Sequence, residues 1–102
     1  MMRMEKRKPH YDLAAVKIAV HQRGADAFTA TALVGAQAMG LDFAQAIRLV
    51  CAMTRADFYK SMTTQADHRI WQDVYRPTTP VGDIYLKLTV MDNVLIVSFK
   101  EL

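Results

Sequence analysis

Six polar side chains in the second half of the sequence are of types that could act on a phosphodiester. They are Lys60, Gln72, Arg76, Tyr85, Lys87 and Lys100. Cations neutralise the charge that develops on a phosphate, and a phenol or an ammonium can transfer a proton. The intrinsic pKa of both lysine and tyrosine is about 10, so these side chains are poor bases at neutral pH unless neighbouring cations lower it. The alternative is an ordinary solvated strand face with cation–aromatic contacts.

Other kinds of catalytic centre find no support in the sequence. There is no glycine-rich phosphate loop and no pair of cysteines separated by two other residues. The histidines His10, His21 and His68 are scattered, without the spacing of metal ligands. Cys51 falls on the apolar stripe of an expected helix, which is typical of a small core residue. Nothing therefore favours a metalloenzyme or a cysteine hydrolase.

A β-hairpin near the C-terminus is expected to position two of the candidates. Residues 83–91 alternate between apolar and polar side chains, residues 94–100 form the next strand, and Asp92–Asn93 suits a two-residue turn. This loop pairs Met91 with Val94 and places Tyr85 opposite Lys100. The same register gathers six apolar side chains on one face of the hairpin. They are Leu86, Leu88 and Val90 of the first strand and Leu95, Val97 and Phe99 of the second. A slip of one residue would mix the two faces, so the register is well specified.

The first half of the chain has the spacing of helices. One helix is expected between Asp12 and Gly24, and another from Thr29 or Thr31 to Gly40. A third begins at the capping pair Asp42 and Gln45, and its apolar stripe is Phe43, Ala46, Ile47, Val50 and Cys51. A capping pattern at 54–57 predicts a short turn of helix through residues 58–60. A strand is expected at 69–76, followed by a loop punctuated by prolines and a glycine.

Together these elements predict an α+β fold, in which N-terminal helices cover one face of a C-terminal antiparallel sheet. The other face stays partly open and carries the tyrosine and lysine side chains. A length of 102 residues indicates one domain spanning 1–102, and no stretch is apolar and long enough for a membrane span. The single cysteine, which excludes an intrachain disulfide, favours the cytoplasm.

Positive charge is concentrated at the N-terminus. Residues 1–10 hold Arg3, Lys6, Arg7 and Lys8 against Glu5, whereas the acidic and basic side chains of residues 11–102 balance. This basic arm either contacts a polyanion or is a solvated tail.

Several long strings resemble the MqsR family of toxins. They are DFYKSMTT at 57–64, DH at 67–68, IWQDVYRP at 70–77, YLK at 85–87 and VLIVSFKE at 94–101, with MEKR at 4–7, PH at 9–10 and GLDF at 40–43. The resemblance runs from about Met4 to the C-terminus, and it is denser after Asp57 than between Gln22 and Met39. Near-continuous strings of this length are far more specific than a short motif.

The resemblance implies a toxin of a type II toxin–antitoxin system with a RelE-like fold. Members of the family are mRNA interferases, endoribonucleases that prefer GCU sequences and need no metal or other cofactor. Attack by the RNA 2′-hydroxyl on the scissile phosphate is the expected mechanism, and inhibition of translation and growth the expected effect. The antitoxin, MqsA, has a zinc-binding domain and a helix-turn-helix domain, so operator DNA would be reached only through it. The family is also linked to persistence and biofilm formation.

The resemblance also implies the site. The family's catalytic positions correspond to Lys60, Gln72, Tyr85 and Lys100, which are all present. The expected substrate contacts are Tyr59, Met62, Arg76, Lys87 and His10. Trp71 is expected in the core, since it alternates with Gln72. The alternative function is a non-catalytic module that binds the antitoxin or RNA and modulates transcription of the operon.

Overall fold

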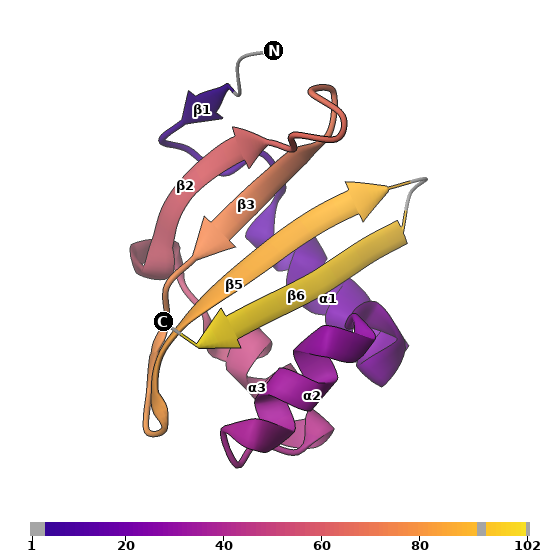
Figure 1. The fold of residues 1–102 in the computed structure, drawn as a ribbon, viewed down its shortest axis with the longest axis vertical. Coiled ribbons are helices and arrows are strands. Elements are labelled where there is room, and N and C mark those ends of the chain that lie inside the picture. The colour runs from indigo at the N-terminus through magenta and orange to yellow at the C-terminus, as the bar shows by residue number, and fades with distance from the viewer. Residues whose placement is uncertain (1–3, 92–93, 102) are drawn as a thin grey trace.

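The computed structural model describes residues 4–91 and 94–101, and it has an α+β fold (Figure 1). The helices of this part of the chain are α1 (Leu13–Arg23), α2 (Ala30–Ala38) and α3 (Phe43–Ala52), with short 3-10 helices at Gly24–Ala27 and Arg55–Asp57. The strands are β1 (Glu5–Lys6), β2 (Phe58–Thr63), β3 (Trp71–Tyr75), β4 (Thr78–Thr79), β5 (Gly82–Met91) and β6 (Val94–Glu101). The predicted fold class is confirmed, although a strand also precedes the first helix.

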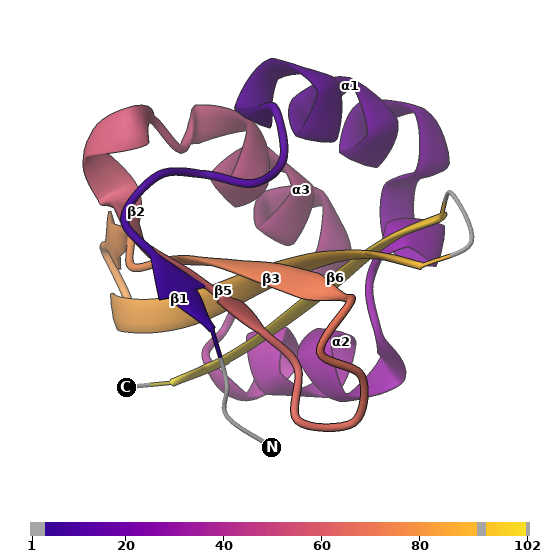
Figure 2. The ribbon, with the colours of Figure 1, turned by 90° about the horizontal axis from the view of Figure 1, so that it is seen from above.

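The strands form an antiparallel sheet in which β1, β2, β3, β5 and β6 lie side by side in that order. The short β4 pairs with the beginning of β5, beyond the end of β3. Helices α1 and α3 cover one face of the sheet, and α2 lies alongside the edge strand β6 (Figure 2). The amide of Thr29, just before α2, donates to the Val97 carbonyl at 2.9 Å and so covers part of that edge.

Buried apolar side chains between the helices and the sheet form one cluster. Its largest fully buried members are Tyr75, Met53, Ile84, Leu86, Leu88, Val20, Val50 and Val97. The three members from β5 alternate along the strand, as its sequence pattern predicts. This packing fixes which face of β5 is left for polar side chains.

The register predicted for the hairpin is confirmed. Met91 pairs with Val94, Leu88 with Val97 and Tyr85 with Lys100. The turn residues Asp92–Asn93 lie outside the described part of the chain. The register follows from burial, because a one-residue shift would turn the apolar side chains of β5 toward solvent.

The helix boundaries also agree with the sequence. Asp12, Thr29 and Asp42 are the N-caps, and Asp42 forms a capping box with Gln45. Some apolar side chains of the helices are exposed, and one of them, Phe43, was expected on the apolar stripe of α3. Val34 is 67% exposed, because α2 packs through Ala32 and Ala36 on the opposite side of the helix. Phe43 is 58% exposed and lies one turn before Ala46, the first buried residue of α3.

The short helix predicted through residues 58–60 is wrong beyond Asp57. The capping pattern does form a 3-10 helix, in which the Thr54 amide donates to the Asp57 carboxylate at 2.8 Å. From Phe58 the chain becomes β2 and pairs with β3. The Phe58 ring lies 5.4 Å from the Tyr75 ring, so aromatic packing and backbone pairing outweigh the local helical signal.

The N-terminal arm is bound to the sheet. Within residues 4–10, β1 pairs with β2, and the Met4 amide donates to Thr63 Oγ1 at 2.9 Å. The amides of His10 and Tyr11 donate to the buried carboxylate of Asp73. The alternative of a solvated tail is therefore wrong for these residues, whereas residues 1–3 lie outside the described chain.

Candidate active site

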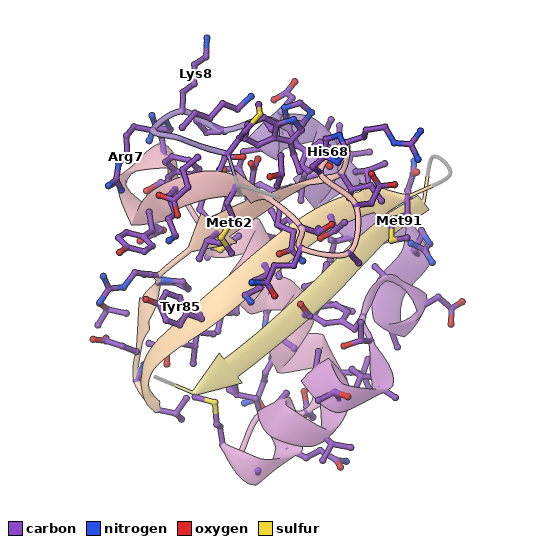
Figure 3. The ribbon with its side chains drawn as sticks, turned by 45° about the horizontal axis from the view of Figure 1, so that its top comes forward. Arg7, Lys8, Met62, His68, Tyr85 and Met91 are labelled. Atoms are coloured by element: carbon purple, nitrogen blue, oxygen red, sulfur yellow. The ribbon has the colours of Figure 1, made fainter. Side chains whose placement is uncertain are left out.

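The face of the sheet away from α1 and α3, here called the open face, collects most of the predicted site residues. Pairing places Lys60 of β2 level with Val74 and Lys87, and Met62 level with Gln72 and Thr89. Tyr85 lies two residues before Lys87 on β5 and therefore on the same face. Figure 3 shows Met62 and Tyr85 on this side of the sheet, with Arg7 at its margin.

Tyr59 reaches this face because of an irregularity in β2. The register shifts between Phe58 and Lys60, which leaves Tyr59 as an extra residue in the strand. Such a bulge breaks the alternation of side chains, so two consecutive residues can serve the same side. Phe58 packs against Tyr75 on the core side, whereas Tyr59 and Lys60 both approach the open face.

Two tyrosines and an arginine form the centre of the site, here called the tyrosine cluster: Tyr59, Tyr85 and Arg76. The tyrosine ring centroids are 6.1 Å apart, with an interplanar angle of 39°. The Arg76 guanidinium carbon lies 4.9 Å from the Tyr59 ring centroid and 5.5 Å from that of Tyr85. Aromatic rings beside a guanidinium offer stacking surface and a positive charge, the two elements that bind single-stranded nucleic acid.

Two further cations approach the Tyr59 ring. The Lys60 Nζ is 5.5 Å from its centroid, and the Arg7 guanidinium carbon is 5.9 Å from it. Lys60 also forms a salt bridge with Glu5, with 3.0 Å between Nζ and Oε1. The open face thus gathers positive charge from the segment after β1, from β2 and from the segment after β3.

An open pocket of about 310 Å³ adjoins the tyrosine cluster. Tyr59 and Arg76 line one part of it, and Asp57 and Asp83 line another. The Asp57 carboxylate already accepts the Thr54 amide, which fixes the 3-10 helix before β2. The pocket therefore offers an aromatic ring, a guanidinium and carboxylates to a planar polar group.

Gln72 shares the open face but lies away from the tyrosine cluster. It pairs with Thr89, which is four residues beyond Tyr85 on β5, or about 13 Å along the strand. Lys87 and Val74 occupy the level between them. Met62, an expected substrate contact, pairs with Gln72 but is buried, with 7% of its surface exposed. Lys100 is placed only by its backbone, opposite Tyr85, and its side chain lies outside the described part of the chain.

His10 is not part of the tyrosine cluster. Its ring stacks on Trp71 with centroids 5.2 Å apart, and its Nδ1 lies 2.8 Å from Lys6 Nζ. Desolvation and the charge of Lys6 lower the pKa of His10, while the Asp73 carboxylate opposes this shift. Trp71 points to the core side of the sheet, as its parity predicts, but it is only half-buried, with Lys6 over its ring at 4.3 Å.

Two charged residues near the site were not expected individually from the sequence. Glu5 and Arg7 belong to the basic arm, whose composition indicated a polyanion contact but not its location. The strand β1 has only two residues and carries no recognisable pattern, so the sequence held no signal for its pairing.

Residues 4–91 and 94–101 contain neither a cluster of metal ligands nor a membrane-spanning helix. No group of three or more histidine, cysteine, aspartate or glutamate side chains there could hold a metal ion. No helix in the same ranges is long and apolar enough to cross a membrane.

Comparison with known proteins identifies the family. Residues 8–101 match the model of a family described as "Motility quorum-sensing regulator, toxin of MqsA". The chain is 52% identical over 98 residues to a protein of Escherichia coli (strain K12) named "mRNA interferase toxin MqsR". That alignment covers 96% of this chain and 99% of the relative. Because the family model and the alignment both cover nearly the whole chain, the chain belongs to the MqsR toxin family.

Proposed function

We propose that this protein is an endoribonuclease toxin that cleaves mRNA and thereby inhibits translation and growth. The observation that carries the proposal is the 52% identity, over nearly the full length of both chains, to a relative named as an mRNA interferase toxin. The tyrosine cluster supports it, because stacking rings and cations on an open face suit single-stranded RNA. GCU-type sequences are the preferred sites under this proposal.

Cleavage proceeds by attack of the RNA 2′-hydroxyl on the adjacent phosphorus. The bond from phosphorus to the 2′-oxygen forms, the bond to the 5′-oxygen breaks, and a 2′,3′-cyclic phosphate and a 5′-hydroxyl result. The protein must remove a proton from the 2′-oxygen, stabilise charge on the phosphate and protonate the leaving 5′-oxygen. The reaction needs no metal cofactor.

The residues divide these tasks. Lys60 and Lys100 bind the phosphate and neutralise its developing charge. Tyr85, whose ring lies 6.1 Å from that of Tyr59, transfers a proton through its hydroxyl. Gln72, about 13 Å farther along the sheet, contacts a neighbouring nucleotide and positions its hydroxyl or reads a base edge.

The other contacts hold the RNA chain. Tyr59 stacks on an unpaired base, which contributes about 1–3 kcal/mol. Arg76 and Lys87 bind phosphates that flank the cleavage site, and Met62 contacts a base only through the small part of its side chain that is exposed. His10, on the opposite side of β3, lies beside the core-side Trp71 and acts at most on a distal part of the substrate.

An antitoxin is the expected protein partner. The family description names MqsA as the partner of these toxins. Under the proposal, an MqsA-like protein with a zinc-binding domain and a helix-turn-helix domain neutralises this chain. Operator DNA is then contacted only through the antitoxin, and both proteins act in the cytoplasm.

The test is cleavage of a purified RNA that contains several GCU sites, without ribosomes and in the presence of EDTA. The cut ends are mapped and their termini identified as cyclic phosphates. The Tyr85→Ala, Lys100→Ala double variant should lose the cuts. Lys100→Met alone should lower kcat about 100-fold or more, in the range found for removal of one electrostatic contact in an active site.

Lys17→Met is the matched control, since it removes the same charge from α1, on the other face of the sheet. It should cleave as the wild type does. Full activity of the folded Lys100→Met variant would remove Lys100 from the mechanism. If the folded wild type cuts neither free RNA nor mRNA in a translating extract, the catalytic function is wrong and a binding module remains.

A further inference from the structure

The salt bridge between Glu5 and Lys60 places a carboxylate inside a site proposed for RNA. Glu5 pairs with Met62 across β1 and β2, so its side chain lies on the open face beside Lys60. Its Oε1 is 3.0 Å from the Lys60 Nζ, within the usual range of an N–H···O hydrogen bond. A carboxylate oxygen at this position has the charge and hydrogen-bonding capacity of a phosphate oxygen.

Exposure decides what this contact can do. The Lys60 and Glu5 side chains are 22% and 44% exposed, so the pair is partly solvated. Exposed pairs of this kind contribute little to stability and hold a flexible lysine only weakly in place. The larger effect is therefore on binding, because a negative charge next to Lys60 repels an incoming phosphate and occupies its ligand.

We infer that Glu5 occupies the position of an RNA phosphate on Lys60, and that RNA binding exchanges the carboxylate for a phosphate. The inference rests on the proposed function, since it assumes that RNA binds the open face. It assigns the Lys60 ammonium as a phosphate subsite and β1 as the element that supplies its resting anion. Glu5 sets the affinity of this subsite, and Lys60 acts on the substrate.

Replacing Glu5 by glutamine should tighten RNA binding in a predictable way. Removing a unit charge about 5 Å from a phosphate in a water-like dielectric lowers a dissociation constant about fourfold. Lys60 then neutralises a phosphate without first losing a carboxylate. The logarithm of the association constant for single-stranded RNA falls linearly with the logarithm of the salt concentration, and in Glu5→Gln the slope of this line should become more negative by about 0.7.

The experiment measures the dissociation constant of a GCU-containing RNA at salt concentrations from about 50 to 300 mM. A single 2′-deoxy substitution at the cut site makes this RNA non-cleavable. The proteins are the full-length wild type, Glu5→Gln and Glu5→Ala. The matched control is Asp26→Asn, which changes the net charge equally but lies in the 3-10 helix after α1. Lys60→Met and the Lys60→Met, Glu5→Gln double variant complete the cycle.

The inference expects tighter binding and a steeper salt slope for both Glu5 variants, no change for Asp26→Asn, and loss of the slope change in the Lys60→Met background. Unchanged or weaker binding by folded Glu5→Gln would overturn it. An equal effect of Asp26→Asn would also overturn it, because net charge alone would then be the cause. Cleavage by the wild type is assayed in parallel, so a failure of this inference is distinguishable from a failure of the proposed function.

Discussion

The carboxylate of Asp73 is expected to fasten the N-terminal segment to the sheet. Asp73 lies on the core side of β3, fully buried, between Ser61 and Leu88. It accepts the His10 amide at 3.0 Å on both oxygens and the Tyr11 amide at 2.8 Å. These contacts join residues more than 60 positions apart in the sequence. His10 and Tyr11 lie in the segment between β1 and α1.

The substitution Asp73→Asn tests this attachment. Two backbone amides donate to the carboxylate, and hydrogen bonds to a charged group contribute about 1.5–3 kcal/mol each. Oδ2 accepts both amides, and asparagine can keep an oxygen there, but its amide donor then replaces Oδ1, 3.0 Å from the His10 amide, and the negative charge that strengthens both hydrogen bonds is lost. We expect a loss of about 2–4 kcal/mol in the free energy of unfolding. For a chain of this size that loss lowers Tm by about 10–20 °C.

Urea unfolding followed by fluorescence measures the change, with Asp83→Asn as the control. Asp83 is exposed at the start of β5, so the same chemical replacement there should alter stability by less than about 0.5 kcal/mol. Limited trypsin digestion supplies a second readout, because release of the arm exposes the bonds after Lys6 and Arg7. A folded Asp73→Asn protein with wild-type stability and an equally resistant arm would refute the reasoning.

Three further predictions concern tyrosine and arginine side chains. The Tyr75 hydroxyl is buried without a hydrogen-bond partner among the described residues, so Tyr75→Phe should stabilise the protein by about 1 kcal/mol at neutral pH in thermal or urea unfolding. Burial raises the pKa of Tyr75 to about 12, so the folded state holds this proton more tightly than the unfolded chain. Wild-type stability should therefore fall as pH rises from about 10 to 12, by about 2–3 kcal/mol through Tyr75, and Tyr75→Phe should remove this part of the dependence. The part due to Tyr11, whose pKa burial also raises, remains; an unchanged pH profile in Tyr75→Phe would contradict the reasoning. Tyr85→Phe should lower kcat about 100-fold with little change in KM, because the ring remains and only the proton-transferring hydroxyl is lost; full activity would restrict Tyr85 to stacking. Arg76→Gln should weaken RNA binding and make the salt slope less negative by about 0.7, and an unchanged slope in the binding titration would show that Arg76 contacts no phosphate.

The hairpin and the helix starts could be predicted because their determinants are local. The apolar alternation in β5 has the period of a strand, and a two-residue loop leaves only one register that buries it. Asp42 and Gln45 satisfy backbone groups within one turn of each other, so the beginning of α3 is readable in four residues. The pairing of Tyr85 with Lys100 follows from the same register.

The rest of the site depends on contacts between distant segments. The helical signal at Arg55–Asp57 ends where β2 finds β3, and the bulge that brings Tyr59 to the open face exists only in that pairing. Arg76 meets both tyrosines because β2, β3 and β5 are neighbours in the sheet. These contacts join residues that are distant in the sequence, and a local pattern cannot relate them. The sequence therefore indicated which side chains belong to the site but not how far apart they lie.

The sequence by itself therefore determined the α+β class, the hairpin register and the kinds of side chain on the open face, because periodicity and capping act over a few residues. Only the tertiary structure decided that the basic arm becomes β1, with Glu5 on Lys60 and Arg7 near Tyr59. A two-residue strand has no pattern of its own. It forms because the neighbouring edge of β2 and the buried Asp73 carboxylate supply hydrogen-bond partners that lie more than 50 residues away.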